Sequence, residues 1–136
     1  MMKKIVFCST LIAASVVAIQ HSQAIGGESL GCFVDDGTPA SFSPGSCAPA
    51  VPRTSYTAKF RVLGGSGSYS YAWTVDAPIL DGCTSTSDYC FVNVVHRNDY
   101  TITASVTLTQ AGQQTTVSAV AEIPSICFLG STPTFC

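Results

Sequence analysis

Positive charge is scarce in this sequence, which has 6 Lys and Arg residues against 8 Asp and Glu residues in a chain of 136. Two of the basic residues lie in residues 1–24, a segment that we expect to be removed. The basic residues that remain are Arg53, Lys59, Arg61 and Arg97. The remaining chain therefore carries a net charge of 4 − 8 = −4. Such a chain lacks the basic surface that binds nucleic acid or anionic lipid, so we expect neither as a partner.

Histidine is also scarce. His96 is the single histidine after residue 24. Any Ser-His-Asp or Cys-His arrangement would have to use His96, which we interpret as a surface residue beside a turn. The sequence has no G-x-S-x-G nucleophile motif and no C-x-x-C pair of the kind that binds zinc. We expect no catalytic residues, no cofactor and no metal site. The chain is therefore predicted not to be an enzyme, with a small hydrolase as the weaker alternative.

Aspartates are the remaining candidates for chemistry, either as paired carboxylates for glycoside hydrolysis or as calcium ligands. They are Asp35, Asp36, Asp76, Asp81, Asp88 and Asp99. All of them lie in expected loops or at strand ends, where an aspartate is favoured because it accepts hydrogen bonds from nearby backbone amides. Asp35-Asp36-Gly37 lacks the further spaced acids of a calcium-binding loop. We therefore interpret these aspartates as structural.

Long apolar runs are absent after residue 24, and the one before it has the layout of a signal peptide. Lys3 and Lys4 precede the apolar stretch Ile5–Ile19, and Ser22-Gln23-Ala24 has small residues at both positions of a cleavage site. We therefore predict a signal peptide over residues 1–24. No later run approaches the roughly 20 apolar residues that span a bilayer. We expect a protein without a membrane span that is secreted, extracellular or on the cell surface, with the periplasm as an alternative.

Cysteine, in contrast, is abundant, with 7 residues in the chain. Cys8 lies in the predicted signal peptide, which leaves an even number of cysteines, as expected for an exported protein with disulfide bonds. These cysteines form three couples that are close in sequence, namely Cys32 with Cys47, Cys83 with Cys90, and Cys127 with Cys136. We predict disulfides within the three couples, while the other connectivities remain open.

Helical periodicity is also absent, and alternation typical of β-strands takes its place. Apolar residues recur at every second position, or β-branched residues cluster, in segments 56–62, 69–75, 91–95, 100–109 and 115–123. The segment 100–109 is the clearest, because apolar residues alternate with Thr or Ser along its whole length. Short strands separated by turns predict an all-β fold of two antiparallel sheets packed as a sandwich.

The chain after the signal peptide divides into three parts. Residues 25–53 are rich in Gly, Ser and Pro, and we expect them to form an irregular arm. Residues 54–126 are expected to form the sandwich, and residues 127–136 a tail closed by a disulfide. The predicted core of the sandwich consists of Phe60, Tyr71, Trp73, Tyr100, Ile102, Val106 and Leu108.

Two segments resemble PKD-type domains, a group of bacterial immunoglobulin-like domains. Gly64-Gly65-Ser66-Gly67-Ser68-Tyr69-Ser70-Tyr71-Ala72-Trp73 is similar to their central strand-turn-strand, and Tyr100–Thr109 followed by Gly112 is similar to their closing hairpin. The resemblance implies an Ig-like antiparallel β-sandwich in which Trp73 packs between the sheets and Tyr100 forms a tyrosine corner. It also implies a module for spacing, adhesion or recognition outside the cell.

The loop between Cys83 and Cys90 is the candidate binding site. Its residues are Thr84, Ser85, Thr86, Ser87, Asp88 and Tyr89. A disulfide-closed loop on a rigid sandwich loses little entropy on binding, and Tyr89 is the aromatic residue that we expect to be most exposed.

These features predict a non-catalytic module that binds an extracellular protein or glycan, or that serves as a structural unit at the cell surface. One alternative is a secreted inhibitor that uses the Cys83 to Cys90 loop. Another is the subunit of an extracellular fibre formed by self-assembly. In that case residues 25–53 or the segment Phe128–Phe135 would pair with a sheet edge of the next subunit.

Overall fold

The computed structural model describes residues 25–94 and 98–136, which form an all-β fold without a helix. The predicted signal peptide and His96 lie outside the described residues. The strands are β1 (Ser29–Asp35), β2 (Ser43–Pro44), β3 (Ser46–Cys47), β4 (Tyr56–Leu63), β5 (Ser70–Val75), β6 (Ile79–Gly82), β7 (Tyr89–Val94), β8 (Tyr100–Gln110), β9 (Gln113–Ile123), β10 (Ile126–Leu129) and β11 (Thr132–Phe135). No helix within the described ranges is long and apolar enough to cross a membrane.

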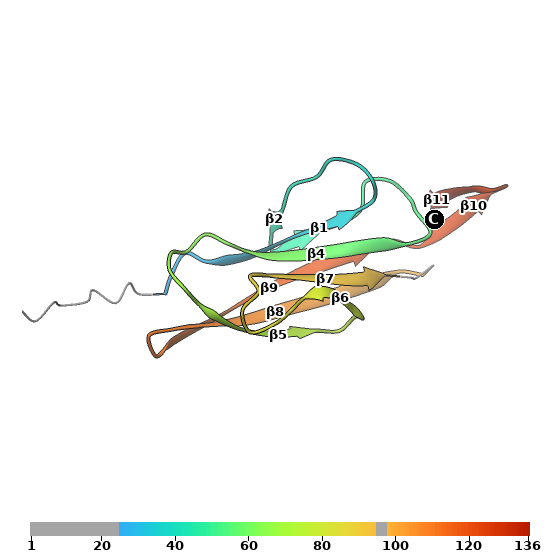
Figure 1. Cartoon of the computed structure of the whole chain (residues 1–136). Helices are drawn as coiled ribbons and strands as arrows, with labels where there is room; N and C mark the ends of the chain where they lie inside the picture. Colours follow the sequence, from blue (N-terminus) through green and yellow to red (C-terminus); the bar gives the residue numbers. More distant parts are fainter. Residues whose placement is uncertain (1–24, 95–97) are drawn as a thin grey trace, which may run out of the picture.

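The strands form two main sheets that lie against each other (Figure 1). The first sheet has five strands in the order β2-β1-β4-β7-β6, and the second has four in the order β3-β9-β8-β5. Neighbouring strands are antiparallel except β3 and β9, which are parallel. Buried residues of both sheets, such as Phe60 and Ile102, belong to one hydrophobic cluster. The all-β prediction is therefore confirmed, and the arrangement is compatible with a β-sandwich.

Alternation along the strands builds this shared core. On β8 the residues Ile102, Val106 and Leu108 are fully buried, while the Thr and Ser residues between them face outward. Phe60 on β4 is also fully buried. Removing such a side chain down to alanine typically costs about 2–5 kcal/mol of stability, so these positions hold the two sheets together.

Three of the four predicted aromatic core residues lie at the border of the cluster, while the fourth, Phe60, is fully buried within it. Tyr71, Trp73 and Tyr100 are half-buried and pack against it. Tyr71 and Trp73 belong to β5, which is the edge strand of its sheet, and Tyr100 is the first residue of β8. Side chains at an edge or an end are covered on fewer sides, which explains the partial exposure.

The tyrosine-corner role implied for Tyr100 stays a prediction, because residues 95–97, just upstream of Tyr100, lie outside the described residues. The Tyr100 hydroxyl donates to the carbonyl of Asp76, 24 residues upstream. Tyr56, at the start of β4, accepts a bond from the backbone N–H of Arg53 at 2.7 Å and donates to the carbonyl of Val51 at 3.2 Å. These two bonds hold the preceding loop against the start of β4.

The prediction that residues 25–53 form an irregular arm is wrong for residues 29–35. They form β1, which pairs along its whole length with β4 and buries Leu30, Cys32 and Val34. Cys32 acts here as a buried apolar residue, and Phe33 faces the opposite side of the sheet. An aromatic residue on the outer face makes both faces of the strand partly apolar, and this hid the period-2 pattern in the sequence.

The three disulfides join the predicted pairs. Cys32–Cys47 connects β1 in one sheet with β3 in the other, over a sequence separation of 15. Closing a loop of that length is worth about 3 kcal/mol in the chain-entropy description of disulfide stabilisation. Cys83–Cys90 closes the loop between β6 and β7. Cys127–Cys136 closes the hairpin of β10 and β11.

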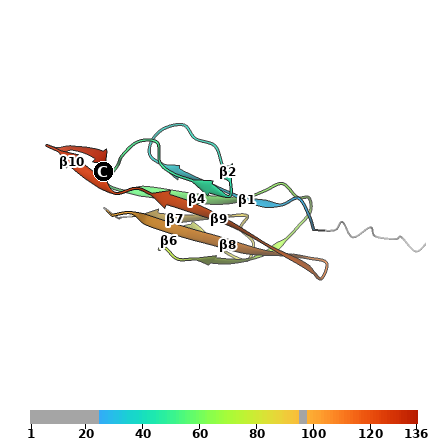
Figure 2. The ribbon, with the colours of Figure 1, turned by 180° about the vertical axis from the view of Figure 1, so that it is seen from behind.

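The C-terminal hairpin forms a separate two-stranded sheet. Figures 1 and 2 show β10 and β11 at one end of the molecule, extending past the main sheets. Leu129, near the turn of this hairpin, is 74% exposed, the largest value among the exposed large hydrophobic residues of the described ranges. Isolated two-stranded hairpins are marginally stable in water, so the disulfide is needed to hold this one.

Candidate binding face

The outer face of the five-stranded sheet carries a groove of about 440 Å³, which we call the aromatic groove. It is lined by Phe33, Phe42, Lys59, Arg61, Asp88, Tyr89 and Phe91. Four of these seven residues are aromatic. Five of the seven lie on β1, β4 and β7 at positions that alternate with buried residues, so the groove follows from the pleat of the sheet.

Strand register places three of these residues in one row. Phe33 on β1 lies opposite Lys59 on β4, and Lys59 lies opposite Phe91 on β7. The Lys59 Nζ is 5.1 Å from the ring centroid of Phe33 and 5.5 Å from that of Phe91. Both distances are within the range of cation–π attraction. Lys59 therefore lies between the two rings and is attracted to both.

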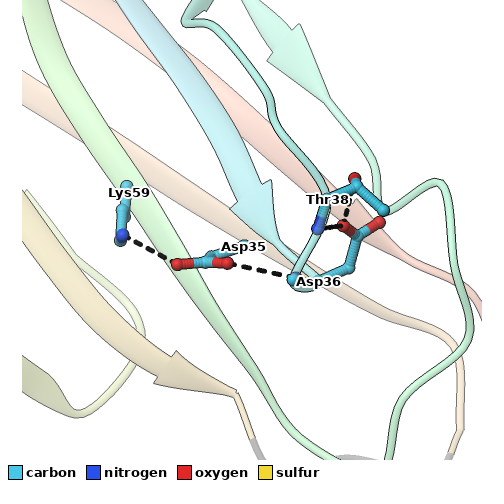
Figure 3. Close-up of polar contacts among 5 residues, drawn as sticks. Asp35, Asp36, Thr38 and Lys59 are labelled. Carbon is cyan, nitrogen blue, oxygen red and sulfur yellow. Dashed lines mark hydrogen bonds and ion pairs between the residues drawn. The ribbon is translucent and has the colours of Figure 1, made fainter.

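Lys59 is also paired with a carboxylate at the end of β1. Its Nζ donates to Asp35 Oδ2 at 2.8 Å, as Figure 3 shows. This bond, together with one from the backbone N–H of Gly37, lowers the pKa of Asp35. The predicted interpretation of Asp35 as a structural residue agrees with these contacts.

Beside the row of Phe33, Lys59 and Phe91 lies a second row across the same three strands. A glycine in this second row leaves space for Phe42, which comes from the loop after β1. Gly31 on β1 is opposite Arg61 on β4, and Arg61 is opposite Tyr89 on β7. A Cβ atom on Gly31 would lie 3.1 Å from the Cβ of Phe42 and would collide with Leu63. Phe42 thus fits over β1 because a glycine is beneath it. Its ring meets that of Phe33 edge to face, with centroids 4.9 Å apart.

The far side of the groove comes from the predicted binding loop. Asp88 Oδ2 accepts a bond from Arg61 Nε at 3.1 Å, and the ring of Tyr89 lies 4.8 Å from that of Phe91. The Tyr89 hydroxyl donates to Asp81 Oδ2 at 3.4 Å. The negative charge of Asp81 raises the pKa of Tyr89. Tyr89 is half-buried, so it is less exposed than the sequence predicted.

The rest of this loop is fastened to both sheets. Its backbone carbonyls accept bonds from the backbone N–H of Tyr71 at 3.0 Å and from the indole Nε1 of Trp73 at 3.0 Å, both on β5. A third carbonyl, that of Asp88, accepts from Val62 on β4 at 2.9 Å. Thr84 and Ser87 bond to each other through their hydroxyls at 2.7 Å. The loop is therefore a rigid support, and of its six residues only Asp88 and Tyr89 line the groove.

Asp36 holds the loop that carries Phe42. Asp36 as a whole is 3% exposed. Its carboxylate accepts bonds from Thr38 Oγ1 at 2.5 Å and Thr38 N at 3.0 Å, and from the N–H groups of Ala50 and Val51 at 2.6 and 2.8 Å. These hydrogen bonds, with those of Thr38 the largest, lower its pKa to about 2. Figure 3 shows Asp36 and Asp35 turned to opposite sides of the end of β1.

The other candidate aspartates also bond to nearby donors. Asp99 accepts from the N–H of Ser125 at 2.7 Å, and Asp76 accepts from the N–H of Thr103 at 2.9 Å. No group of three or more His, Cys, Asp or Glu residues within the described ranges is arranged to hold a metal ion. These contacts fit the structural interpretation of the aspartates.

Sequence reasoning missed Phe33, Phe42 and Phe91. For Phe91 a signal was available, because it alternates with the buried residues Cys90 and Val92 and must therefore face outward. The Lys59 and Arg61 positions of β4 gave the same outward face. Phe91 lies opposite Lys59 on the neighbouring strand. An outward aromatic residue on one strand and an outward lysine on the next could together have predicted the groove. Phe42, which lies outside the strands, had no comparable signal.

Comparison of this chain with models of protein families, with curated proteins and with solved structures gave no match.

Proposed function

We propose that this chain is an exported, non-catalytic binding module with an immunoglobulin-like sandwich, and that the aromatic groove is its binding face. Strand order supports the immunoglobulin-like part of the proposal. If β1, β4, β7 and β6 are strands A, B, E and D, then β9, β8 and β5 are strands G, F and C. Sheets of composition ABED and CFG are those of a constant-type immunoglobulin domain.

Export is supported by the disulfides. Three disulfides among the described residues are expected in an oxidising, extracellular environment and are rare in the cytosol. The signal peptide of residues 1–24 remains a prediction from sequence.

The observation that carries the binding proposal is the row of Phe33, Lys59 and Phe91. Aromatic side chains usually turn inward, and three half-buried rings gathered with Phe42 on an outer face indicate a recognition surface. The face is rigid because β4 and β7 pair on both sides and β1 pairs along its whole length with β4. A rigid face loses little conformational entropy when it binds.

A binding panel with two matched variants tests this proposal. The oxidised protein is measured by surface plasmon resonance against immobilised extracellular matrix proteins, mucins and polysaccharides. The double variant Phe33→Ala/Phe91→Ala should bind at least about 10-fold more weakly, since two central aromatic anchors are lost. Thr107→Ala, on the outer face of the other sheet, should bind as the wild type does. Equal binding by both variants would contradict the proposal.

A fibre subunit is the second candidate function, and the C-terminal hairpin favours it. Leu129 is 74% exposed and Phe135 is 38% exposed, on a hairpin that extends past the main sheets. Apolar residues on a protruding element suit contact with another copy of the chain. Light scattering on the oxidised protein should give a mass far above that of one chain if this is correct. A Leu129→Ser variant should then return it to the monomer.

A further inference from the structure

We infer that the aromatic groove binds a neutral saccharide, an inference that rests on the proposed binding function. Three features of the groove support a neutral saccharide as the ligand. They are the balance of its charges, its half-exposed aromatic rings, and its position on a face of the sheet rather than at an edge.

The charges of the groove are balanced before any ligand arrives. Lys59 is bonded to Asp35 at 2.8 Å, and Arg61 is bonded to Asp88 at 3.1 Å. An anionic ligand would have to compete with these two carboxylates, and a cationic ligand would meet the two cations. A neutral ligand avoids both costs, because it can bond to the pairs without separating them.

The polar groups of the groove suit hydroxyl groups in particular. An ammonium has three N–H donors and a guanidinium has five, while each carboxylate oxygen accepts more than one hydrogen bond. In the groove, the side chain of Asp88 is 40% exposed and that of Arg61 is 53% exposed, while that of Asp35, which is bonded to Lys59 but is not one of the lining residues, is 40% exposed. A hydroxyl both donates and accepts, so sugar hydroxyls can bond to either member of an ion pair.

The rings supply the apolar part of the site. A pyranose ring has C–H groups on its faces and hydroxyls around its edge, which matches half-exposed rings that flank charged groups. The groove volume of about 440 Å³ lies within the usual range for small-ligand sites, so it has room for a short oligosaccharide. Arg61, between Gly31 and Tyr89 in the second row, extends the polar surface along the strands.

A peptide that binds by strand addition does not fit this position. Strand addition requires an unpaired sheet edge. The groove lies over β1, β4 and β7. β4 and β7 pair on both sides, and β1 pairs with β4 along its whole length and with β2 at Gly31 and Cys32. A partner must therefore be held by side-chain contacts alone, as sugars commonly are.

The test is an NMR titration of ¹⁵N-labelled, oxidised protein with named probes. Neutral hexasaccharides of glucose, xylose and N-acetylglucosamine are compared with a hexasaccharide of galacturonic acid, which has the same size but carries carboxylates. We expect at least one neutral probe to shift the amide signals of Phe33, Lys59 and Phe91, and Phe91→Ala to weaken that binding at least about 10-fold. Thr107→Ala should leave it unchanged.

Three results would overturn the inference in different ways. If the galacturonate probe binds more tightly than every neutral probe, or if sugar-dependent shifts lie on the β8–β9 face, the neutral-saccharide assignment is wrong. If no sugar shifts the groove signals but an extracellular protein binds with dependence on Phe33 and Phe91, the saccharide inference fails while the proposed binding function stands. If nothing binds through these residues, both fail.

Discussion

The two outer faces of this protein are built by the same strand alternation but carry opposite chemistry. On the β8–β9 face, Ser105 bonds to Ser118 and Thr107 bonds to Thr116, each pair at 2.8 Å between hydroxyl oxygens. These residues lie opposite each other in the sheet, so their hydroxyls satisfy one another. On the β1–β4–β7 face, rings and ion pairs line a groove instead. The same alternation of outward polar residues can therefore produce a surface whose polar groups bond to one another or a surface that can bind a ligand. The residue that lies opposite each one decides between the two.

The largest expected effect comes from removing the disulfide between the sheets. The variant Cys32→Ala/Cys47→Ala should lose about 3 kcal/mol of unfolding free energy, because the unfolded chain is no longer restrained. The loop that carries Phe42 lies within the residues that this disulfide spans. NMR signals of the aromatic groove should therefore shift more than those of the β8–β9 face. Urea unfolding and amide spectra measure both effects, and uniform shifts over both faces would contradict the second.

Filling the space beneath Phe42 should have the next largest effect. Gly31→Ala should lower the unfolding free energy by about 1–3 kcal/mol, because the new methyl group meets Leu63 and Phe42. Ser118→Ala, the control on the other outer face, should change it by no more than about 0.5 kcal/mol. Thermal and urea unfolding compare the two variants. Equal stabilities would show that the glycine does not make room for the loop.

Acid should loosen the groove through Asp36. Its pKa is lowered from 3.8 to about 2 in the folded protein, so its stabilising contribution is present above pH 4 and is lost as the pH falls from about 4 through 2. We expect a loss of about 1–2 kcal/mol over this range, after allowing for screening by solvent. In Asp36→Asn this part of the pH dependence should be absent. Urea unfolding between pH 2 and 6 measures it, and parallel curves for the two proteins would refute the assignment.

The smallest effect tests the central row. Lys59→Met keeps the apolar stem but removes the charge between Phe33 and Phe91, and should cost about 0.5–1 kcal/mol of stability. The pKa of Asp35 should rise, since the hydrogen bond from Lys59 is the largest cause of its lowering. An NMR titration of the carboxyl carbon follows this pKa. An unchanged value would mean that the ion pair does not form in solution.

Much of the fold could be predicted because its signals are local. The alternation on residues 100–109 gave β8, and the spacing of the cysteines gave all three disulfides. β1 was missed because Phe33 on its outer face obscured the alternation of Leu30, Cys32 and Val34. The irregular composition of residues 36–53 gave no sign that Asp36 would be buried there. Its donors, the amides of Ala50 and Val51, lie 14 and 15 residues away.

The sequence by itself determined that segments such as 56–62 and 100–109 are strands, which face of each of them is apolar, and which cysteines are near one another. These properties depend on residues a few positions apart. Only the tertiary structure decided that Phe33, Lys59 and Phe91 form one row and that Phe42 folds back over Gly31. The reason is register: a shift of one residue between β1 and β4 or between β4 and β7 would move these side chains apart, and the register is set by the packing of the whole core.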